Sequence, residues 1–364
     1  MKLPAKSAVI TLVLALCFSC STKENNSGYS KAISLTKHLL DSIRIAQRIP
    51  GIDAAVAIDG KIVWSEGFGY ADLEHEVKVI PGVTRFRIGS VSKPLTSAAM
   101  GKLIDEGKID LNASVYDYLP DFPRKKYPIT IKQISGHIGG IRHYRGNEFL
   151  MNKRFNSVTS SLSIFQNDSL LFEPGSDYRY SSYGFNLLSA VVEKASGESF
   201  LPYIHRVVFS ALDMQSTCPD LNDSIIVHRT SFYQLDSLNN VINAPSVDNS
   251  YKWAGGGFLS TTTDLIKFGE AHMQPGFLSE STLKVFTTSQ VLTSGDSTSY
   301  GVGWRTYRHD GLSGYGHTGG SVGGITAFRI YPHQKMVLVL LSNSSNTSYG
   351  DSGDKIAKWF LHEN

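Results

Sequence analysis

The spacing of hydrophobic positions changes from helical to strand-like near residue 50. From Tyr29 to about Arg48 apolar residues recur every three or four positions, and the pattern stops before Pro50-Gly51. Two β-rich runs follow, Ile52–Ile58 and Lys61–Tyr70, joined by Asp59-Gly60, which is a strong two-residue turn signal. The pattern therefore predicts an amphipathic helix followed by a β-hairpin.

The middle of the chain is predicted to be helical and rich in loops. A helix is expected from Ser90 to about Glu106, with Gly107 as a plausible residue just after its end. Further helices are expected from Thr130–Ile134 and near Tyr180. Thr261-x-x-Asp264 fits the position of a capping box before another helix.

The C-terminal third returns to strand patterns and closes with an amphipathic helix. The expected strands are Tyr300–Tyr307, Tyr315–Gly320, Ile325–Tyr331 and Met336–Leu341. Strands at both ends of the chain bracket a helical middle. We therefore predict an α+β fold (an α/β sandwich): an antiparallel sheet built from both termini, flanked by helices, with a helical subdomain inserted at about residues 109–299.

The first twenty residues have the composition of an export signal. Lys2 and Lys6 precede an apolar run at residues 8–16, which is too short to span a bilayer. A small residue before Cys20 resembles a lipoprotein cleavage box, although Cys17 stands where Leu is usual. We predict residues 1–20 as a signal peptide with lipid attachment at Cys20, residues 21–30 as a flexible tether and residues 31–364 as the folded domain. Simple secretion and an uncleaved anchor are the alternatives.

Composition narrows the classes of function. The formal charge is +3 over 364 residues without a basic run, so nucleic-acid binding is not expected. No His-x-x-x-His pair is present, and the Cys-x-x-Cys at Cys17 and Cys20 lies within the predicted export signal. A structural role is therefore favoured over metal binding for His137 and His143. Once Cys17 and Cys20 are accounted for, Cys218 is left alone and is expected to be a buried, small apolar residue.

A Ser-x-x-Lys sequence at Ser90 and Lys93 is the first candidate for chemistry. Residues three apart share a helix face, so the lysine amine can activate the serine hydroxyl as a nucleophile. The same spacing occurs at Ser34, Ser281 and Ser352, where a solvated helix surface is the simpler interpretation. The copy at Ser90 is favoured because an apolar, glycine-containing segment precedes it and suitable partners follow it.

Two further regions supply those partners. Tyr180, near a predicted helix start, becomes a general base if a neighbouring lysine lowers its pKa; a core tyrosine is the alternative. The run Gly314–Gly324 is dense in glycine and contains His317 and Thr318, which indicates close backbone approach on a strand. Backbone N–H groups there would complete an oxyanion hole with that of Ser90, and a strand bulge with a surface histidine is the alternative.

Taken together, these regions resemble the serine β-lactamase and penicillin-binding-protein-like hydrolases of the class C type, and within them the mitochondrial serine β-lactamase-like branch. The resemblance spans roughly residues 30–364. The matching stretches are Phe86–Lys93, Asp105–Leu111, Tyr118–Pro120, Ile129–Tyr144, Tyr180–Gly184 and His317–Gly320.

The resemblance implies a role for each motif position. Ser90 would be the acylated nucleophile, with Lys93 keeping its hydroxyl poised. Tyr180 would act as general base. In the motif His317-Thr318-Gly319-Gly320, Thr318 would hold a substrate carboxylate, and the N–H of Gly320 would join that of Ser90 in the oxyanion hole.

Two positions depart from the family pattern. Ser182 replaces the usual Asn of Tyr-x-Asn, and a hydroxyl cannot offer the paired donor and acceptor of an amide. His317 replaces the usual Lys, which leaves less positive charge at pH 7 for a carboxylate. Both changes argue against an efficient β-lactamase and fit a peptidase or esterase with a different acyl donor.

We therefore expect a cofactor-independent serine hydrolase that cleaves amide or ester bonds through an acyl-enzyme on Ser90. Its substrates would be small peptides or esters, some of them derived from peptidoglycan. Weak β-lactamase activity is a further activity that the sequence does not separate from these. We expect it in the bacterial cell envelope, anchored to the membrane through lipid. The alternatives are a penicillin-binding sensor or a silent ligand-binding protein on the same scaffold, and more remotely a structural role.

Overall fold

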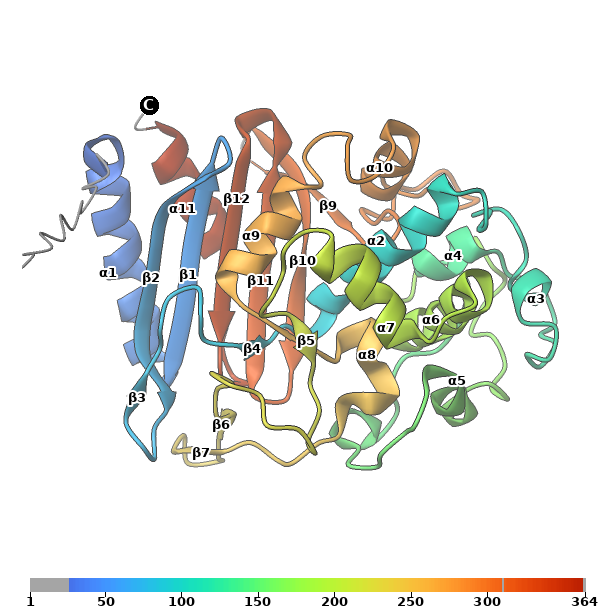
Figure 1. Ribbon diagram of the computed structural model, residues 1–364, viewed down its shortest axis with the longest axis horizontal. Helices are drawn as coiled ribbons and strands as arrows, with labels where there is room; N and C mark the ends of the chain where they lie inside the picture. The colour runs from blue at the N-terminus through green and yellow to red at the C-terminus, as the bar shows by residue number, and fades with distance from the viewer. Residues whose placement is uncertain (1–25, 310, 363–364) are drawn as a thin grey trace, which may run out of the picture.

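The computed structural model describes residues 26–309 and 311–362 and contains one seven-stranded antiparallel sheet (Figure 1). The strand order is β3-β2-β1-β12-β11-β10-β9. The predicted signal peptide, Cys20 and residues 21–25 of the predicted tether lie outside the described residues. The strands of this sheet are β1 Gly51–Ile58, β2 Lys61–Asp72, β3 Val77–Lys78, β9 Arg305–His309, β10 Leu312–Ser321, β11 Gly324–Tyr331 and β12 Met336–Ser342.

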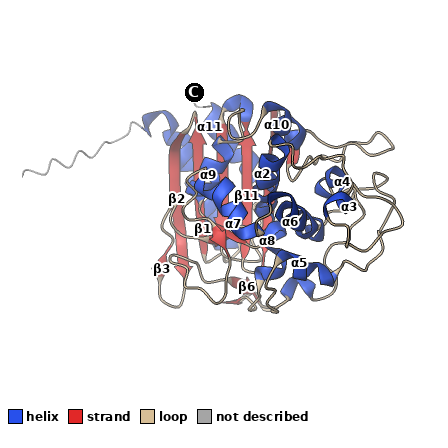
Figure 2. Cartoon of the chain, turned by 45° about the vertical axis from the view of Figure 1, so that its right-hand side comes forward, coloured by secondary structure: helices blue, strands red, loops and turns tan. Residues whose placement is uncertain are grey.

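Helices cover both faces of this sheet, and most of the short ones gather to one side (Figures 1 and 2). The helices are α1 Ser30–Ala46, α2 Ser92–Asp105, α3 Val115–Tyr118, α4 Ile131–Ser135, α5 Val158–Ser161, α6 Ser182–Ser196, α7 Phe200–Ile204, α8 Trp253–Gly256, α9 Thr262–Glu270, α10 Glu280–Thr287 and α11 Ser352–His362. The smaller strands are β4 Phe86–Arg87, β5 Cys218–Pro219, β6 Tyr233–Leu235, β7 Val241–Asn243 and β8 Phe258–Ser260.

The two ends of the chain meet in the centre of the sheet. β1 pairs antiparallel with β12, with Ile52 opposite Ser342 and Ile58 opposite Met336. The β1–β2 turn has both Asp59 (φ 49°) and Gly60 (φ 75°) in the left-handed region, as a type I′ hairpin requires. The predicted antiparallel sheet built from both termini is confirmed.

Both faces of β12 are buried, because successive side chains point to opposite sides. Met336, Leu338 and Leu340 pack with α1 and α11, whereas the alternate residues Val337 and Val339 join the larger core shared with α2, α6 and α9. Each fully buried aliphatic side chain of this kind contributes about 1.5–3 kcal/mol. This burial fixes the sheet as a rigid support for the loops and helices beside β10.

Three local predictions need correction. The strand expected from Tyr300 begins only at Arg305, because residues 300–304 form a tight loop in which the N–H of Gly301 donates to the carbonyl of Trp304 (2.8 Å). Thr261 caps α9 by accepting from the N–H of Asp264 (3.2 Å), but the Asp264 carboxylate turns away to Thr217 (2.8 Å) and so does not complete a box.

Cys218 is the third correction. It lies in β5 half-buried rather than fully buried, and Arg85 donates to its Sγ (3.8 Å). Burial raises the pKa of its thiol, which disfavours the reactive thiolate. The cysteine is therefore a structural residue of the small sheet β4-β8-β5.

Candidate active site

Ser90 lies in a one-turn 3₁₀ helix, Gly89–Val91, directly before α2, and not within the helix itself. Gly89 has φ 49°, and a Cβ there would lie 2.6 Å from the carbonyl oxygen of Gly320. Only glycine satisfies both the left-handed backbone and the close contact. The turn that carries Ser90 is thus pressed against β10, which agrees with the close backbone approach predicted from the glycine density of residues 314–324.

Lys93 is the best-positioned partner of Ser90. Its side chain is fully buried, and Nζ lies 3.0 Å from Ser90 Oγ and 3.0 Å from Ser182 Oγ. Its third contact, 2.6 Å long, is to the carbonyl oxygen of Gly255 in α8. Three segments far apart in the sequence therefore converge on one amine.

The environment of Lys93 favours its neutral form. Burial, reinforced by the positive charges of Lys252 and Arg305, holds the pKa of Lys93 well below its ordinary value of 10.5. A neutral amine has two N–H donors and one lone pair. Gly255 and Ser182 can accept the two donors, and the lone pair can then accept the proton of the Ser90 hydroxyl. This is the arrangement that a general base needs.

Tyr180 lies beside this pair, with the centre of its ring 4.7 Å from Lys93 Nζ. Its hydroxyl makes no hydrogen bond within the described residues. Burial raises the pKa of Tyr180 far above its ordinary value, and the nearby Ser90 hydroxyl and Arg305 oppose this only in part. The expectation that Lys93 lowers this pKa is wrong for the free protein, because burial outweighs the effect of an amine that is itself neutral.

The N-terminus of α6 positions the second motif. Ser181 is the N-cap and accepts from the N–H of Gly184 (3.0 Å). The N–H of Ser181 donates to His137 Nδ1 (3.2 Å), and that of Ser182 donates to His143 Nδ1 (3.1 Å). Two imidazoles therefore satisfy backbone donors that the helix leaves unpaired at its start, which leaves the hydroxyl of Ser182 for Lys93.

Both of these histidines are uncharged at neutral pH. Burial, followed by the electrostatic effect of Lys93, holds the pKa of His137 well below 6.5 and lowers that of His143 to about 4. Since each Nδ1 accepts a hydrogen bond, the proton of each ring is on Nε2. The structural interpretation favoured for them from the sequence agrees with these contacts.

His317 points into the protein from β10 and is 3 % exposed. Its Nδ1 donates to the carbonyl oxygen of Thr318 (2.6 Å), so its Nε2 accepts from the hydroxyl of Tyr300 (2.9 Å). Burial, with the positive charge of Arg305, holds the pKa of His317 well below 6.5. The residue is therefore neutral and does not supply the charge of the lysine usual at this position.

Thr318, Gly319 and Gly320 form the edge of β10 that faces the Ser90 turn. Thr318 and Gly320 are exposed and Gly319 is buried. A Cβ on Gly319 would lie 1.9 Å from the carbonyl oxygen of Ile88 and 3.2 Å from the amide nitrogen of Ser90. The backbone of β10 thus passes immediately beside the Ser90 amide, where two N–H groups are needed for an oxyanion.

Arg305 is a cation of the site that the sequence did not reveal. It lies at the start of β9, with its guanidinium carbon 5.4 Å from the ring centre of Tyr180, and its Nε is buried without a partner in the described part of the chain. A cavity of about 240 Å³ is lined by Arg305, His317 and Thr318, among others. Arg305 therefore supplies positive charge next to Thr318.

The structure brings Ser90, Lys93, Tyr180 and Ser182 around one point, with β10 alongside. Sequence reasoning missed the carbonyl of Gly255, which contacts Lys93, and missed Arg305. The Gly255–Gly257 run was a usable signal, since a Cβ on Gly255 would lie 2.9 Å from the carbonyl of Ser182. Arg305 had no comparable signal in the sequence.

Within residues 26–309 and 311–362, no group of three or more His, Cys, Asp or Glu side chains is placed to hold a metal ion. In the same ranges no helix combines the length and the apolar character needed to cross a bilayer.

A sheet built from both termini, with a buried Ser-x-x-Lys where it meets a helical region, defines the class of β-lactamase-fold hydrolases. The family model described as Beta-lactamase matches residues 34–359. The chain therefore belongs to the beta-lactamase family.

Individual relatives extend this assignment. The mitochondrial serine beta-lactamase-like protein LACTB of Mus musculus is 32% identical to this chain, in an alignment that covers 84% of this chain and 74% of the relative. The human LACTB is 31% identical, with 84% and 73% covered. The resemblance inferred from the motifs, including the mitochondrial branch, is confirmed.

Solved structures agree in fold. An octameric penicillin-binding protein homologue from Pyrococcus abyssi has a TM-score of 0.80 at 22% identity, covering 91% of this chain and 78% of that one. A D-amino acid amidase from Ochrobactrum anthropi, complexed with D-phenylalanine, has a TM-score of 0.79 at 18% identity, with 92% and 99% covered. The hydrolase EstCE1, with promiscuous acyltransferase activity, has a TM-score of 0.74 at 21% identity, with 93% and 98% covered.

Proposed function

We propose that this chain is a serine hydrolase that cleaves amide or ester bonds through an acyl-enzyme on Ser90. The main support is the fully buried Lys93, with its lowered pKa and its Nζ 3.0 Å from Ser90 Oγ. Burying a lysine costs free energy, and the contact of this amine with a serine hydroxyl supports a role as a base.

In the proposed acylation step, Ser90 Oγ attacks the carbonyl carbon of the substrate and transfers its proton to Lys93 Nζ. The backbone N–H groups of Ser90 and Gly320 stabilise the resulting oxyanion. The bond to the leaving nitrogen or oxygen then breaks. Tyr180 donates its hydroxyl proton to the leaving group and regains one from Lys93.

Deacylation repeats these transfers with water as the nucleophile. Water loses a proton to Lys93, which is neutral again after acylation, and attacks the acyl carbon. The bond to Ser90 Oγ then breaks, the acid is released, and Ser90 Oγ regains a proton from Lys93, directly or through Tyr180. Tyr180 is protonated before the reaction, which supports a role as a proton donor and relay. The resemblance to the family had led us to expect a general base instead.

We further propose that the preferred substrates carry a carboxylate close to the scissile bond. Arg305 and Thr318 line the same small cavity, and His317 beside them is neutral. An arginine next to a hydroxyl suits a carboxylate ligand. The D-amino acid amidase of similar fold was solved with an amino acid, which carries such a group.

Steady-state hydrolysis of matched substrates tests the proposal. N-acetyl-D-Ala-D-Ala and its C-terminal amide differ only in the carboxylate, and p-nitrophenyl acetate reports simple esterase activity. We expect turnover of the acid in preference to its amide, loss of that preference in Arg305→Gln, and no turnover in Ser90→Ala. Activity that persists in Ser90→Ala would refute the assignment, and a single stoichiometric burst would indicate a sensor that acylates once.

We also propose that the chain is exported and anchored to the cell envelope by lipid on Cys20. The support is the sequence alone, a basic start followed by a short apolar run and a small residue before Cys20. The mass of the N-terminal peptide from membrane-extracted protein tests this. An unmodified Cys20, or a peptide that still begins at residue 1, contradicts it.

A further inference from the structure

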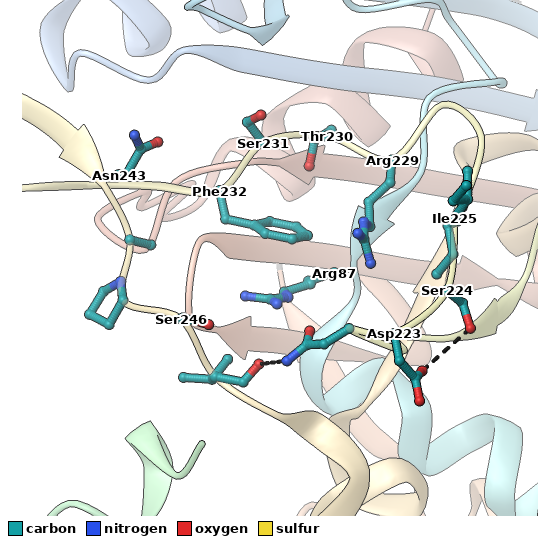
Figure 3. Close-up of a pocket in the computed structure, with 15 residues that line it drawn as sticks. Arg87, Asp223, Ser224, Ile225, Arg229, Thr230, Ser231, Phe232, Asn243 and Ser246 are labelled. Carbon is teal, nitrogen blue, oxygen red and sulfur yellow. Dashed lines mark hydrogen bonds between the residues drawn. The ribbon is translucent and has the colours of Figure 1, made fainter. Parts of the chain in front are cut away.

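A second cavity, of about 810 Å³, lies beside the hairpin formed by β6 and β7 (Figure 3). Its walls are the chain segments 222–226, 229–232 and 243–247, together with Arg87 of β4. The volume falls in the range of small-molecule sites, about 300–1,000 Å³. None of the residues assigned above to catalysis lines it.

Arg87 forms the floor of this cavity. The side chain is only 5 % exposed, and its Nε donates to Asp220 (2.7 Å) while Nη1 donates to the carbonyl oxygen of Val322 (2.8 Å). The ring of Phe232 covers one face of the guanidinium, 3.6 Å from its carbon. Its Nη2 makes no hydrogen bond within the described chain. The guanidinium is therefore held rigidly with donors to spare.

Arg229 enters the same space from the opposite wall, as Figure 3 shows. Its Nη1 donates to the carbonyl oxygen of Leu221 (3.0 Å) and lies 3.5 Å from Asp220 Oδ1. Among the described residues, neither its Nε nor its Nη2 has an acceptor. This edge of a guanidinium matches the two oxygens of a carboxylate or phosphate.

The charges around the cavity do not cancel. Asp220 is 1 % exposed, and this single carboxylate is shared by Arg87, Arg229 and the amide of Asn249 (2.7 Å). Asp223 also lines the cavity, but its side chain is 67 % exposed and lies 3.6 Å from Arg154. The buried part of the cavity thus carries two guanidinium groups against one carboxylate and favours an anion.

Thr230 provides an independent sign of a missing ligand. It is 3 % exposed, and its Oγ1 is buried without a hydrogen-bond partner in the described residues. Figure 3 shows this oxygen directed toward the space between Phe232 and Arg229. Because buried hydroxyls are almost always paired, an unpaired one that lines a cavity is expected to have its partner in a ligand.

One part of the cavity rim is apolar, whereas residues such as Asn222 and Ser224 make other parts polar. Ile225 is fully exposed, at 101 %, and it lines the cavity together with Ile226 and Val247. A large aliphatic side chain that protrudes into water next to a polar floor gains burial when a ligand with an apolar part covers it. The cavity therefore presents a positively charged floor and one apolar stretch of rim at Ile225.

We propose that this cavity binds a small organic anion, whose carboxylate or phosphate group contacts Arg87, Arg229 and Thr230 and whose apolar part lies against Ile225. The site is separate from Ser90 and does not depend on the proposed hydrolase function. It nevertheless shares chain segments with the candidate active site, since Arg87 lies three residues before Ser90 and bonds to Val322, two residues after Gly320.

Isothermal titration calorimetry of the full chain tests the proposal with three probes of matched length: hexanoate, monohexyl phosphate and the neutral hexanamide. The Ser90→Ala protein is used so that turnover does not contribute heat. We expect at least one of the anions to bind about tenfold or more tightly than hexanamide, and the stronger one identifies the group that the site prefers. In Arg229→Gln the affinity should fall about tenfold or more, whereas Arg206→Gln, at an exposed arginine paired with Glu198, should leave it unchanged.

A second variant keeps the test decisive if loss of Arg229 perturbs folding. Thr230→Val preserves shape and removes only the hydroxyl, and it should weaken anion binding severalfold. Equal affinity for hexanamide and both anions, no binding of any probe, or unchanged anion affinity in both Arg229→Gln and Thr230→Val would overturn the proposal. Binding to wild type that disappears when Ser90 is replaced or blocked would assign the site to the catalytic region and also overturn it.

Discussion

At the scale of single residues, two buried lysines shape the electrostatics of the candidate site. Lys93 and Lys252 are both almost inaccessible to water, and the positive charge of Lys252 helps to keep Lys93 neutral. Lys252 has no acidic partner among the described ion pairs, and its Nζ lies 4.2 Å from the ring centre of Phe149. Burial, with a smaller effect of Arg87, lowers the pKa of Lys252 from 10.5 to about 7. Burying Lys252 in this way lowers the free energy of unfolding.

Lys252→Met is therefore predicted to stabilise the protein in a pH-dependent way. Between about pH 7 and 10.5 the unfolded chain keeps a proton on Lys252 that the folded chain has lost, so wild-type stability rises with pH across this window. The variant has no such group. Its free energy of unfolding should exceed that of wild type by about 1–4 kcal/mol at pH 6, and the difference should shrink toward pH 10. Urea unfolding at several pH values measures the difference.

Lys61→Met, at an exposed lysine, is the control and should show a small difference that does not change with pH. Two results would contradict the lowered pKa of the buried Lys252. One is a Lys252→Met variant that is no more stable than wild type at pH 6, and the other is a stability difference that does not diminish as the pH rises.

The sequence was sufficient to pair Ser90 with Lys93, because a three-residue spacing before a helix puts both side chains on one side. It did not predict that the pKa of Tyr180 would be raised. That direction depends on how completely His137, Tyr300 and their neighbours enclose the phenol, which tertiary packing decides.

At the scale of elements, the critical contact is between β10 and the Ser90 turn. Gly319 touches the carbonyl of Ile88, whereas a Cβ on Gly320 would meet only Ile325 Cδ1, at 3.7 Å. The two neighbouring glycines of this strand therefore differ in how well they accommodate an added Cβ. The same substitution at both positions tests this difference.

Gly319→Ala is predicted to separate β10 from Ser90, because its Cβ would lie 1.9 Å from a backbone oxygen that cannot move freely. Misplacing the oxyanion donors by about 1 Å should reduce kcat/KM about a hundredfold or more. Gly320→Ala keeps its backbone N–H and should stay within about threefold of wild type. Kinetics on one ester substrate compare the two, and equal effects would contradict the assigned packing.

Elements were predictable where the local signal was strong. Asp59-Gly60 located the β1–β2 hairpin, and the apolar run at 336–341 located β12. The start of β9 was misplaced because Gly303, at φ 78°, bends the chain against Ser97 of α2, a contact that the strand-like residues 300–304 do not reveal.

At the scale of the whole molecule, the candidate site forms where a sheet made from both chain ends meets the helical region. Ser90 comes from the 3₁₀ turn before α2 and Lys93 from α2 itself, whereas Ser182 comes from α6, Gly255 from α8 and His317 from β10. No periodicity relates positions separated by roughly a hundred residues, so only the ordered resemblance to a family indicated that they would meet. The limits of the predicted subdomain, about 109–299, stay a prediction.

The central claim is that Ser90 is an activated nucleophile, and the intact mass of the protein after incubation with a fluorophosphonate tests it most directly. The account predicts one adduct per chain, located on Ser90 by peptide mapping and absent from Ser90→Ala. Labelling should also become faster as the pH rises through the lowered pKa of Lys93, since only the neutral amine can accept the serine proton. An unmodified wild-type chain, or an adduct that persists in Ser90→Ala, would contradict the account.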